Sequence, residues 1–146
     1  MRALPERMPN ITKENVQAIR RLIDKTIPDC LVQSYRPLIA GLELPDPNDR
    51  HVLAAAIRCG AQVIVTCDKS HFPVEELSPY DIEAQHPDTF IIYQKEENTL
   101  AVLAQLKAAR LTYNQPQLSV EEFIARFRND EMVLTGAWLE SAGSLL

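Results

Sequence analysis

A predicted helix that is followed almost at once by a buried strand constrains the fold more than any other feature of this sequence. Residues 49–59 are apolar on most sides, which is typical of a helix that packs on two sides, and Asn48 can cap its start. Gly60 is the residue type that ends helices in the left-handed conformation. Residues 62–67 are β-branched and continuous, as expected of a parallel strand covered on both faces. The sequence therefore predicts an α/β fold.

The short connection in this unit predicts where a site would lie. A helix over 48–59 is about 18 Å long and a strand over 62–67 about 20 Å, so the strand doubles back along the helix. Asp49, in the first helical turn, and Asp68, just past the strand, then lie at one sheet edge, where ligand sites of open α/β sheets are found. Carboxylate oxygens suit Mg²⁺ or Mn²⁺. Four further side chains are expected near this edge: Asp46, Asn48, Thr66 and His71.

Each of these residues also has an ordinary structural interpretation. Asp49 would interact favourably with the helix dipole whether or not it has a function. Asp46 precedes a proline and can simply shape a turn, and Asp68 can belong to a polar loop. For His51 and His71, taken singly, a packing or surface role is favoured over metal binding. The site hypothesis therefore depends on the convergence of several residues.

Charge, apolar runs and cysteines limit the class of protein. Twenty acidic residues stand against fifteen basic ones, a net charge of −5 at pH 7, which argues against binding to nucleic acid mainly through a basic surface. An enzyme that acts on nucleic acid through metal ions is still compatible with this charge. No run approaches the roughly 18 apolar residues of a membrane span. Three cysteines without CxxC spacing favour neither a disulfide framework nor a zinc site, so we expect a cytoplasmic protein with reduced thiols.

The rest of the chain reads as part of one domain over residues 1–146, in which residues 87–146 form a helical C-terminal part. This agrees with the length usual for a domain, about 100–200 residues. Local periodicity, caps and turn residues predict the other elements. They are a helix over 13–25 capped by Thr12, a strand over 30–33, a helical turn over 35–41, a helix over 73–77, a strand over 81–85, and helical segments over 87–93, 98–111, from Ser119 and over 130–142.

Two runs carry a resemblance to a known family. Residues 44–57 and 63–73 resemble the second half of a PIN domain, in the bacterial group that includes VapC-type toxins. The resemblance extends from about residue 12 onward and is most specific around residues 45–73. It implies an α/β/α sandwich and a metal-dependent endoribonuclease whose acidic residues hold Mg²⁺ or Mn²⁺. Such a cation would neutralise charge on the scissile phosphate and lower the pKa of a water.

The resemblance also assigns roles to individual residues. Asp49 matches the family's third acidic position and Asp68 the fourth, so these two would bind the metal. Thr66 would orient a carboxylate or the water, and Asp46 would lie just outside the ligands. The family often has Asn in place of Asp68 and Asp in place of His71. We expect the carboxylates of Asp49 and Asp68 to lie within about 8 Å of each other, as a shared cation requires.

The family's first strand, which ends in an Asp, and the following helix with a Glu have no counterpart here. The sequence is therefore interpreted as an N-terminally truncated PIN-like fold with an open sheet edge. Two functions follow as alternatives. One is a toxin–antitoxin endoribonuclease that acts on RNA, and the other is a catalytically inactive PIN remnant that binds another protein or a second copy of itself. We expect a homo-oligomer, or completion of the sheet by another chain such as an antitoxin.

Overall fold

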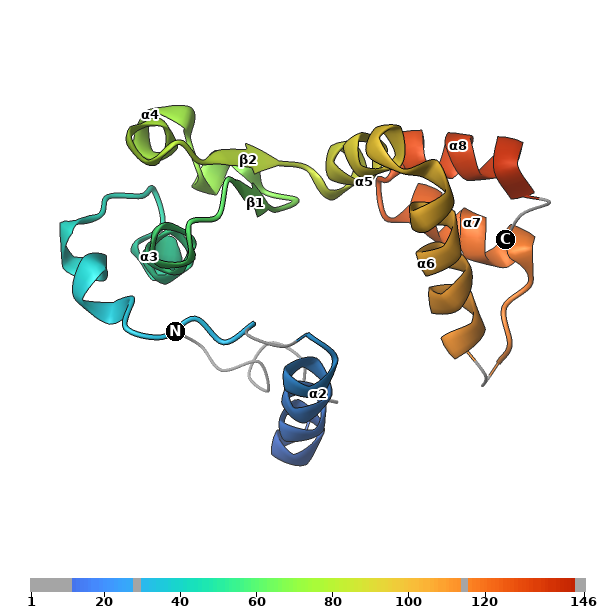
Figure 1. Cartoon of the computed structure of the whole chain (residues 1–146), viewed down its shortest axis with the longest axis horizontal. Helices are drawn as coiled ribbons and strands as arrows, with labels where there is room; N and C mark the ends of the chain where they lie inside the picture. Colours follow the sequence, from blue (N-terminus) through green and yellow to red (C-terminus); the bar gives the residue numbers. More distant parts are fainter. Residues whose placement is uncertain (1–11, 28–29, 114–115, 144–146) are drawn as a thin grey trace. The chain divides into compact units, whose positions relative to one another are not determined.

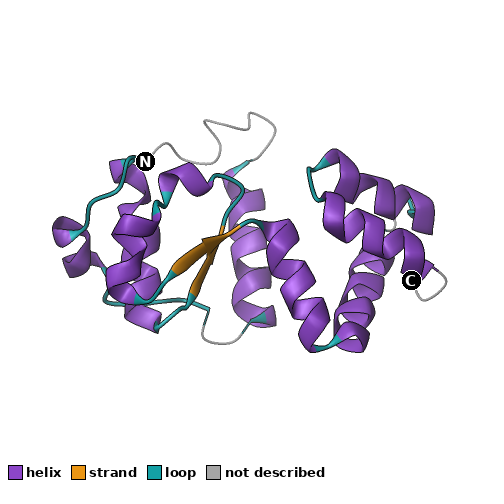
Figure 2. Cartoon of the chain, turned by 90° about the horizontal axis from the view of Figure 1, so that it is seen from above, coloured by secondary structure: helices purple, strands orange, loops and turns teal. Residues whose placement is uncertain are grey.

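The computed structural model describes residues 12–27, 30–113 and 116–143 (Figures 1 and 2). The chain forms two compact units, and each is described by itself. The first contains residues up to 64 together with residues 70–83, and the second contains residues 65–69 and the chain from 84 onward. Among the described helices, none combines the length and the apolar character needed to cross a membrane.

The first unit is built mainly from short helices. Its helices are α2 (Lys13–Thr26), η1 (Arg36–Gly41), η2 (Pro47–Asp49), α3 (Arg50–Cys59), α4 (Val74–Leu77) and η4 (Ser78–Tyr80). Three short elements have residues in both units: β1 (Val63–Val65), η3 (Lys69–His71) and β2 (Glu83–Gln85). α3 packs against η1 and η2. Its buried side chains are Leu53, Ala54 and Ala56, so the expected apolar helix forms the centre of this unit.

The start of α3 differs from the expected one. Asn48 does not cap the helix, because the side chain of Asp46 accepts a hydrogen bond from the Asn48 backbone amide and begins the short helix η2 instead. α3 then starts at Arg50, with Asp49 in the N-cap position. The end of the helix is as predicted: Gly60 has a φ of 69°, and its amide bonds to the carbonyl groups of the last turn.

The sheet has two strands in the described chain, β1 and β2. They are parallel, since Glu83 N–H donates to the Gln62 carbonyl at 3.0 Å and Thr66 N–H donates to the Gln85 carbonyl at 2.9 Å. The strands expected over 62–67 and 81–85 are therefore confirmed but shorter. The expectation of cover on both faces was wrong for Val65, which is 45% exposed. The α/β class is confirmed in this coarse form, a largely helical chain with a short parallel sheet.

In the segment before α3, the helix predicted over 13–25 and the helical turn predicted over 35–41 are confirmed, and the strand predicted over 30–33 is wrong. α2 forms as expected, and the Thr12 hydroxyl accepts a hydrogen bond from the Asn15 amide at 3.2 Å. Residues 30–33 do not form a strand. The strand propensity of a run of four residues is weak, and hydrogen bonding to an adjacent strand decides whether the run forms a strand.

The described residues of the second unit form four helices with their own core. They are α5 (Pro87–Glu97), α6 (Thr99–Thr112), α7 (Val120–Asn129) and α8 (Val133–Ala142). The core is centred on Leu103, Ile124 and Leu139. The predicted capping box at Ser119 is present, since its hydroxyl accepts from the Glu122 amide while the Glu122 carboxylate accepts from the Ser119 amide. The helical segments predicted over 87–93, 98–111, from Ser119 and over 130–142 thus correspond to these four helices.

A buried carboxylate connects two of these helices. Asp88, in the first turn of α5, accepts hydrogen bonds from the amides of Leu134 and Thr135 at 2.8 and 2.7 Å. These amides lie at the start of α8, whose N-cap residue, Met132, makes no side-chain capping bond. Asp88 therefore caps α8 from a different helix, and it stabilises the packing of α5 on α8.

Candidate metal centre

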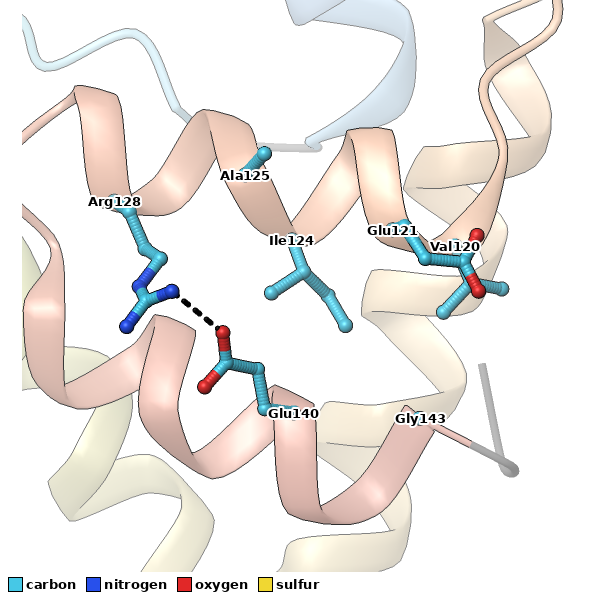
Figure 3. A pocket seen from close by; sticks show the side chains of 7 residues that line it. All are labelled: Val120, Glu121, Ile124, Ala125, Arg128, Glu140 and Gly143. Atoms are coloured by element: carbon cyan, nitrogen blue, oxygen red, sulfur yellow. Dashed lines mark ion pairs between the residues drawn. The ribbon is translucent and has the colours of Figure 1, made fainter.

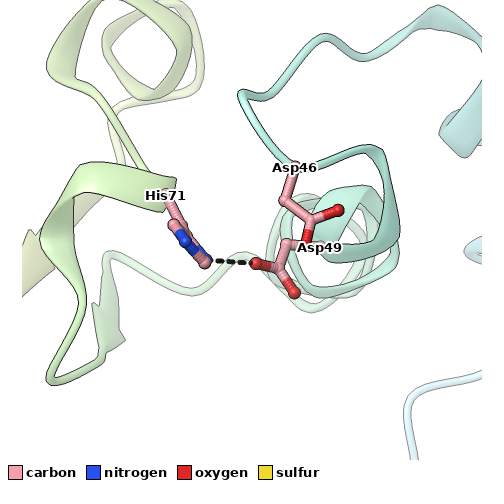
Figure 4. A group of neighbouring side chains, drawn as sticks. All are labelled: Asp46, Asp49 and His71. Atoms are coloured by element: carbon pink, nitrogen blue, oxygen red, sulfur yellow. Dashed lines mark hydrogen bonds and ion pairs between the residues drawn. The ribbon is translucent and has the colours of Figure 1, made fainter. Parts of the chain in front are cut away.

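Three side chains in the first unit form a group that could hold a metal ion. They are Asp46, Asp49 and His71, and the potential ligand atoms lie within 4.8 Å of one another (Figure 4). The closest approach joins His71 Nδ1 and Asp49 Oδ2, at 2.8 Å. All three residues are partly buried, so the group is held in place by the fold and is still accessible to solvent.

Local backbone structure positions the two carboxylates. Asp46 Oδ1 accepts hydrogen bonds from the backbone amide and the side-chain amide of Asn48, at 2.8 and 2.9 Å. The Asp49 amide donates to the Asp46 carbonyl at 3.0 Å, which closes the turn of η2. Pro47 starts this turn with its backbone already restrained to the required φ. The turn therefore brings two carboxylates, three residues apart in sequence, to the beginning of α3.

His71 reaches the same place from a separate segment. It is the last residue of η3, and it precedes the buried Phe72 and then Pro73, the N-cap of α4. Burial of Phe72 anchors the backbone on which the imidazole stands. In Figure 4 the ring points toward the carboxylate of Asp49. The group is thus assembled from two segments more than twenty residues apart.

The donor set fits a divalent cation. Two carboxylates and one imidazole supply oxygen and nitrogen ligands, and Mg²⁺ or Mn²⁺ completes a partial protein shell with water. Neighbouring ligands of an octahedral ion with bonds of about 2.1 Å lie about 3 Å apart, close to the separation between Asp49 and His71. The residues present are therefore suited to holding such an ion.

The sequence-predicted residues are distributed as follows. Asp49 is in the group, and Asp46, expected just outside the ligands, is a potential ligand itself. Asp68 and Thr66 lie in the segment Val65–Lys69, which belongs to the second unit. There the Thr66 hydroxyl accepts a hydrogen bond from the Asp68 amide at 3.1 Å. The approach of the Asp68 carboxylate to Asp49 stays a prediction.

His71 was expected near this edge, and the structure adds that its ring contacts Asp49, with Nδ1 and Oδ2 2.8 Å apart. Whether it binds a metal or has a packing or surface role stays a prediction. The available signal was its position in the loop after the strand, between Asp68 and an apolar pair of residues, Phe72 and Pro73, that fixes the backbone. A loop histidine has no periodicity that would reveal the direction of its ring.

A hollow of about 480 Å³ lies between α7 and α8, in the second unit (Figure 3). Val120 and Ile124 provide apolar lining, and Arg128 Nη1 and Glu140 Oε1 form an ion pair of 2.8 Å across its rim. Because Arg128 neutralises Glu140, Glu121 is the remaining carboxylate among the lining residues, so this hollow offers a cation fewer acidic ligands than the group around Asp49 does.

Comparison with known proteins adds evidence from sequence. The family described as the VapC50 C-terminal domain matches residues 87–141. A protein of Mycobacterium tuberculosis (strain ATCC 25618 / H37Rv) with the curated name "Putative ribonuclease VapC50" is 50% identical over 72 residues. Over part of its length, this chain is a relative of the VapC-type PIN toxins. No solved structure matches the chain.

The relation to VapC50 covers a limited share of both proteins. The aligned region is 47% of this chain and 42% of the mycobacterial protein, so the chain matches less than half of this curated relative. The VapC50 C-terminal family corresponds to α5–α8, in the second unit, whereas Asp46, Asp49 and His71 lie in the first.

Proposed function

We propose that this protein is a metal-dependent endoribonuclease of the toxin–antitoxin type, with RNA as substrate and an antitoxin protein as partner. The observation that carries the proposal is the convergence of Asp46, Asp49 and His71 within 4.8 Å. The relation to VapC-type toxins supports the same chemistry, since a relative bears the name of a ribonuclease. A Mg²⁺ or Mn²⁺ ion at this place would neutralise charge on a phosphate and lower the pKa of a water.

The residues of the group have distinct parts in this proposal. Asp49 supplies the carboxylate nearest the imidazole, and the Asn48 amides hold the carboxylate of Asp46 in a fixed rotamer. Fixed ligands lose little entropy when they bind an ion, which favours a defined geometry. Asp68 as a further ligand stays the prediction made from the sequence, and the Thr66 hydroxyl, which accepts from the Asp68 amide, keeps the turn of that segment in place.

Cleavage of a single-stranded RNA tests the proposal. We expect cleavage with Mg²⁺ or Mn²⁺ and none with EDTA. Asp49→Asn should lower the rate by about 100-fold or more, the size expected when a group that stabilises developing charge is lost. The same substitution should abolish the rise in melting temperature that the ion causes by binding the folded state.

A matched control is available on α2. Asp24 is exposed and lies 3.8 Å from Arg20, and Asp24→Asn removes a carboxylate of the same kind far along the chain from the group. It should leave both cleavage and the metal-induced shift unchanged. Cleavage that persists in EDTA, or that Asp49→Asn does not change, would refute a metal-dependent ribonuclease at this place.

A second candidate function, a protein-binding or self-associating module, is favoured by a different observation. Ile19, Leu22 and Ile23 on α2 are exposed, and the described sheet consists of two short strands. A two-stranded sheet is only marginally stable by itself, and exposed apolar side chains on one helix favour coverage by another chain. We propose that a second copy of the chain provides this cover.

Self-association can be measured by light scattering at micromolar concentration. We expect a dimer for the wild type and a monomer for Ile23→Glu, because the substitution places a charge in the proposed apolar contact. Gln17→Glu, an exposed polar position of the same helix, serves as the control and should stay dimeric. A monomeric wild type would rule out this second function as a self-associating module.

A further inference from the structure

One of the three potential ligands in the first unit is a nitrogen atom. His71 contributes an imidazole to a group that otherwise contains the carboxylates of Asp46 and Asp49. Nitrogen and oxygen ligands differ in the ions that they favour. Mg²⁺ takes oxygen ligands almost exclusively and gives up its water reluctantly, whereas first-row transition-metal ions bind imidazole readily.

We propose that His71 makes this centre selective for a first-row transition-metal ion over Mg²⁺. The inference rests on the proposed metal-dependent function, and it concerns which ion the centre takes. The separation of 2.8 Å between His71 Nδ1 and Asp49 Oδ2 is suitable for two neighbouring ligands of one octahedral ion. His71 and Asp49, which contact each other directly, are thus close enough for both to bind one ion.

The surroundings of His71 support a fixed ligand. His71 precedes the buried Phe72 in sequence, and its side chain is partly exposed. On the opposite side, Asn48 holds the Asp46 carboxylate through two hydrogen bonds of 2.8 and 2.9 Å. An ion that enters this group meets one nitrogen and two carboxylates that need little rearrangement, so the nitrogen contributes directly to the preference between ions.

Mn²⁺ is the appropriate probe of this selectivity. Zn²⁺ and Cu²⁺ bind thiolates strongly, and Cys30, Cys59 and Cys67 are exposed and free. Mn²⁺ has a low affinity for thiolates, shares its octahedral geometry with Mg²⁺, and gives an electron paramagnetic resonance signal that separates free from bound ion. Binding of Mn²⁺ and its competition by Mg²⁺ can therefore be measured on the full chain without RNA.

The decisive comparison is between the wild type and His71→Asp, which offers three carboxylates. We expect the wild type to bind Mn²⁺ more tightly than Mg²⁺, and His71→Asp to lower the ratio of the two affinities about tenfold, equivalent to 1.4 kcal/mol. Pulsed resonance of bound Mn²⁺ should show coupling to an imidazole nitrogen in the wild type and not in His71→Asp. Circular dichroism checks that the variant is folded.

His86→Asn is the matched control. His86 lies in the other unit, where its ring accepts a hydrogen bond from the Asp88 amide at 3.2 Å, and Asn is a good replacement in such an N-cap position. This variant should keep both the affinity ratio and the nitrogen coupling of the wild type.

The possible results separate this inference from the proposed activity. An unchanged affinity ratio or persistent nitrogen coupling in His71→Asp would overturn the inference and leave the ribonuclease proposal standing. Mn²⁺ preference that depends on His71, together with no RNA cleavage, would support the inference and count against the ribonuclease. Absence of Mn²⁺ binding, or binding that Asp49→Asn does not weaken, would overturn both.

Discussion

Asp88→Asn is expected to lower the free energy of unfolding by about 2–4 kcal/mol at pH 7, the range for breaking a buried, charge-assisted hydrogen-bond network. Both carboxylate oxygens of Asp88 accept amides at the start of α8, and the residue is only 5% exposed. Asparagine has one acceptor oxygen and one amide group, so one backbone N–H of α8 would face another donor. Urea unfolding at pH 7 measures the loss.

The effect depends on pH in a defined direction. Burial alone would raise the pKa of Asp88, but hydrogen bonds from Thr135 and Leu134, with His86 nearby, outweigh it and lower the pKa below its ordinary value of 3.8. A group with a lowered pKa stabilises the folded state fully above its ordinary pKa, and the contribution disappears as pH falls through the folded value. The difference between wild type and Asp88→Asn should therefore be constant near neutral pH and shrink below about pH 3.8.

Asp130→Asn is the matched control for this measurement. Asp130 is an exposed aspartate of the same unit, at the end of α7. Surface substitutions of this kind change stability by less than about 0.5 kcal/mol. If Asp88→Asn were no more destabilising than Asp130→Asn at pH 7, the carboxylate would not be a cap of α8 in solution.

Leu139→Ala is expected to cost about 2–5 kcal/mol of unfolding free energy, since it removes buried methyl groups and leaves a cavity. Leu139 is 0% exposed and lies in the core of the second unit with Leu103 and Ile124. A cavity between α8 and its neighbours cannot close completely, because the helices are already anchored by other contacts. Denaturant unfolding followed by circular dichroism gives the change.

Leu100→Ala makes the same chemical change at an exposed position. Leu100 lies in the first turn of α6 and is 76% exposed, so its truncation should alter stability by less than about 0.5 kcal/mol. Equal losses for the two leucine variants would mean that the described core does not exist in solution.

The parts of the fold that local chemistry determines could be predicted from sequence. Thr12, Ser119 and Gly60 mark helix ends through bonds and backbone angles within a few residues, and the structure confirms all three. The strand expected over 30–33 was wrong, because strand formation depends on a partner that the segment itself does not specify. The contact of Asp88 with Leu134 joins residues 46 apart, and no local pattern indicates it.

In the candidate site, too, the local features could be predicted from the sequence and the tertiary contacts could not. Asp49 could be identified because a short helix–strand connection places the helix start at a sheet edge. The proximity of Asp46 follows from one turn, so it is local as well. His71 was expected near the same edge, but its direct contact with Asp49 depends on side-chain packing, which the spacing of residues in sequence does not encode. The place of Asp68 relative to Asp49 depends likewise on tertiary structure.

Because Asp88 caps α8, the helical part of the chain has to include residue 88, although nothing in the sequence of α8 itself indicates this. A fragment or gene fusion that begins after residue 88 would retain every residue of α8 but leave the amides of Leu134 and Thr135 without their acceptor. These helices can therefore be transferred between proteins, by recombination or by design, only as a block that includes the start of α5. The matched family region begins at Pro87, one residue before this limit.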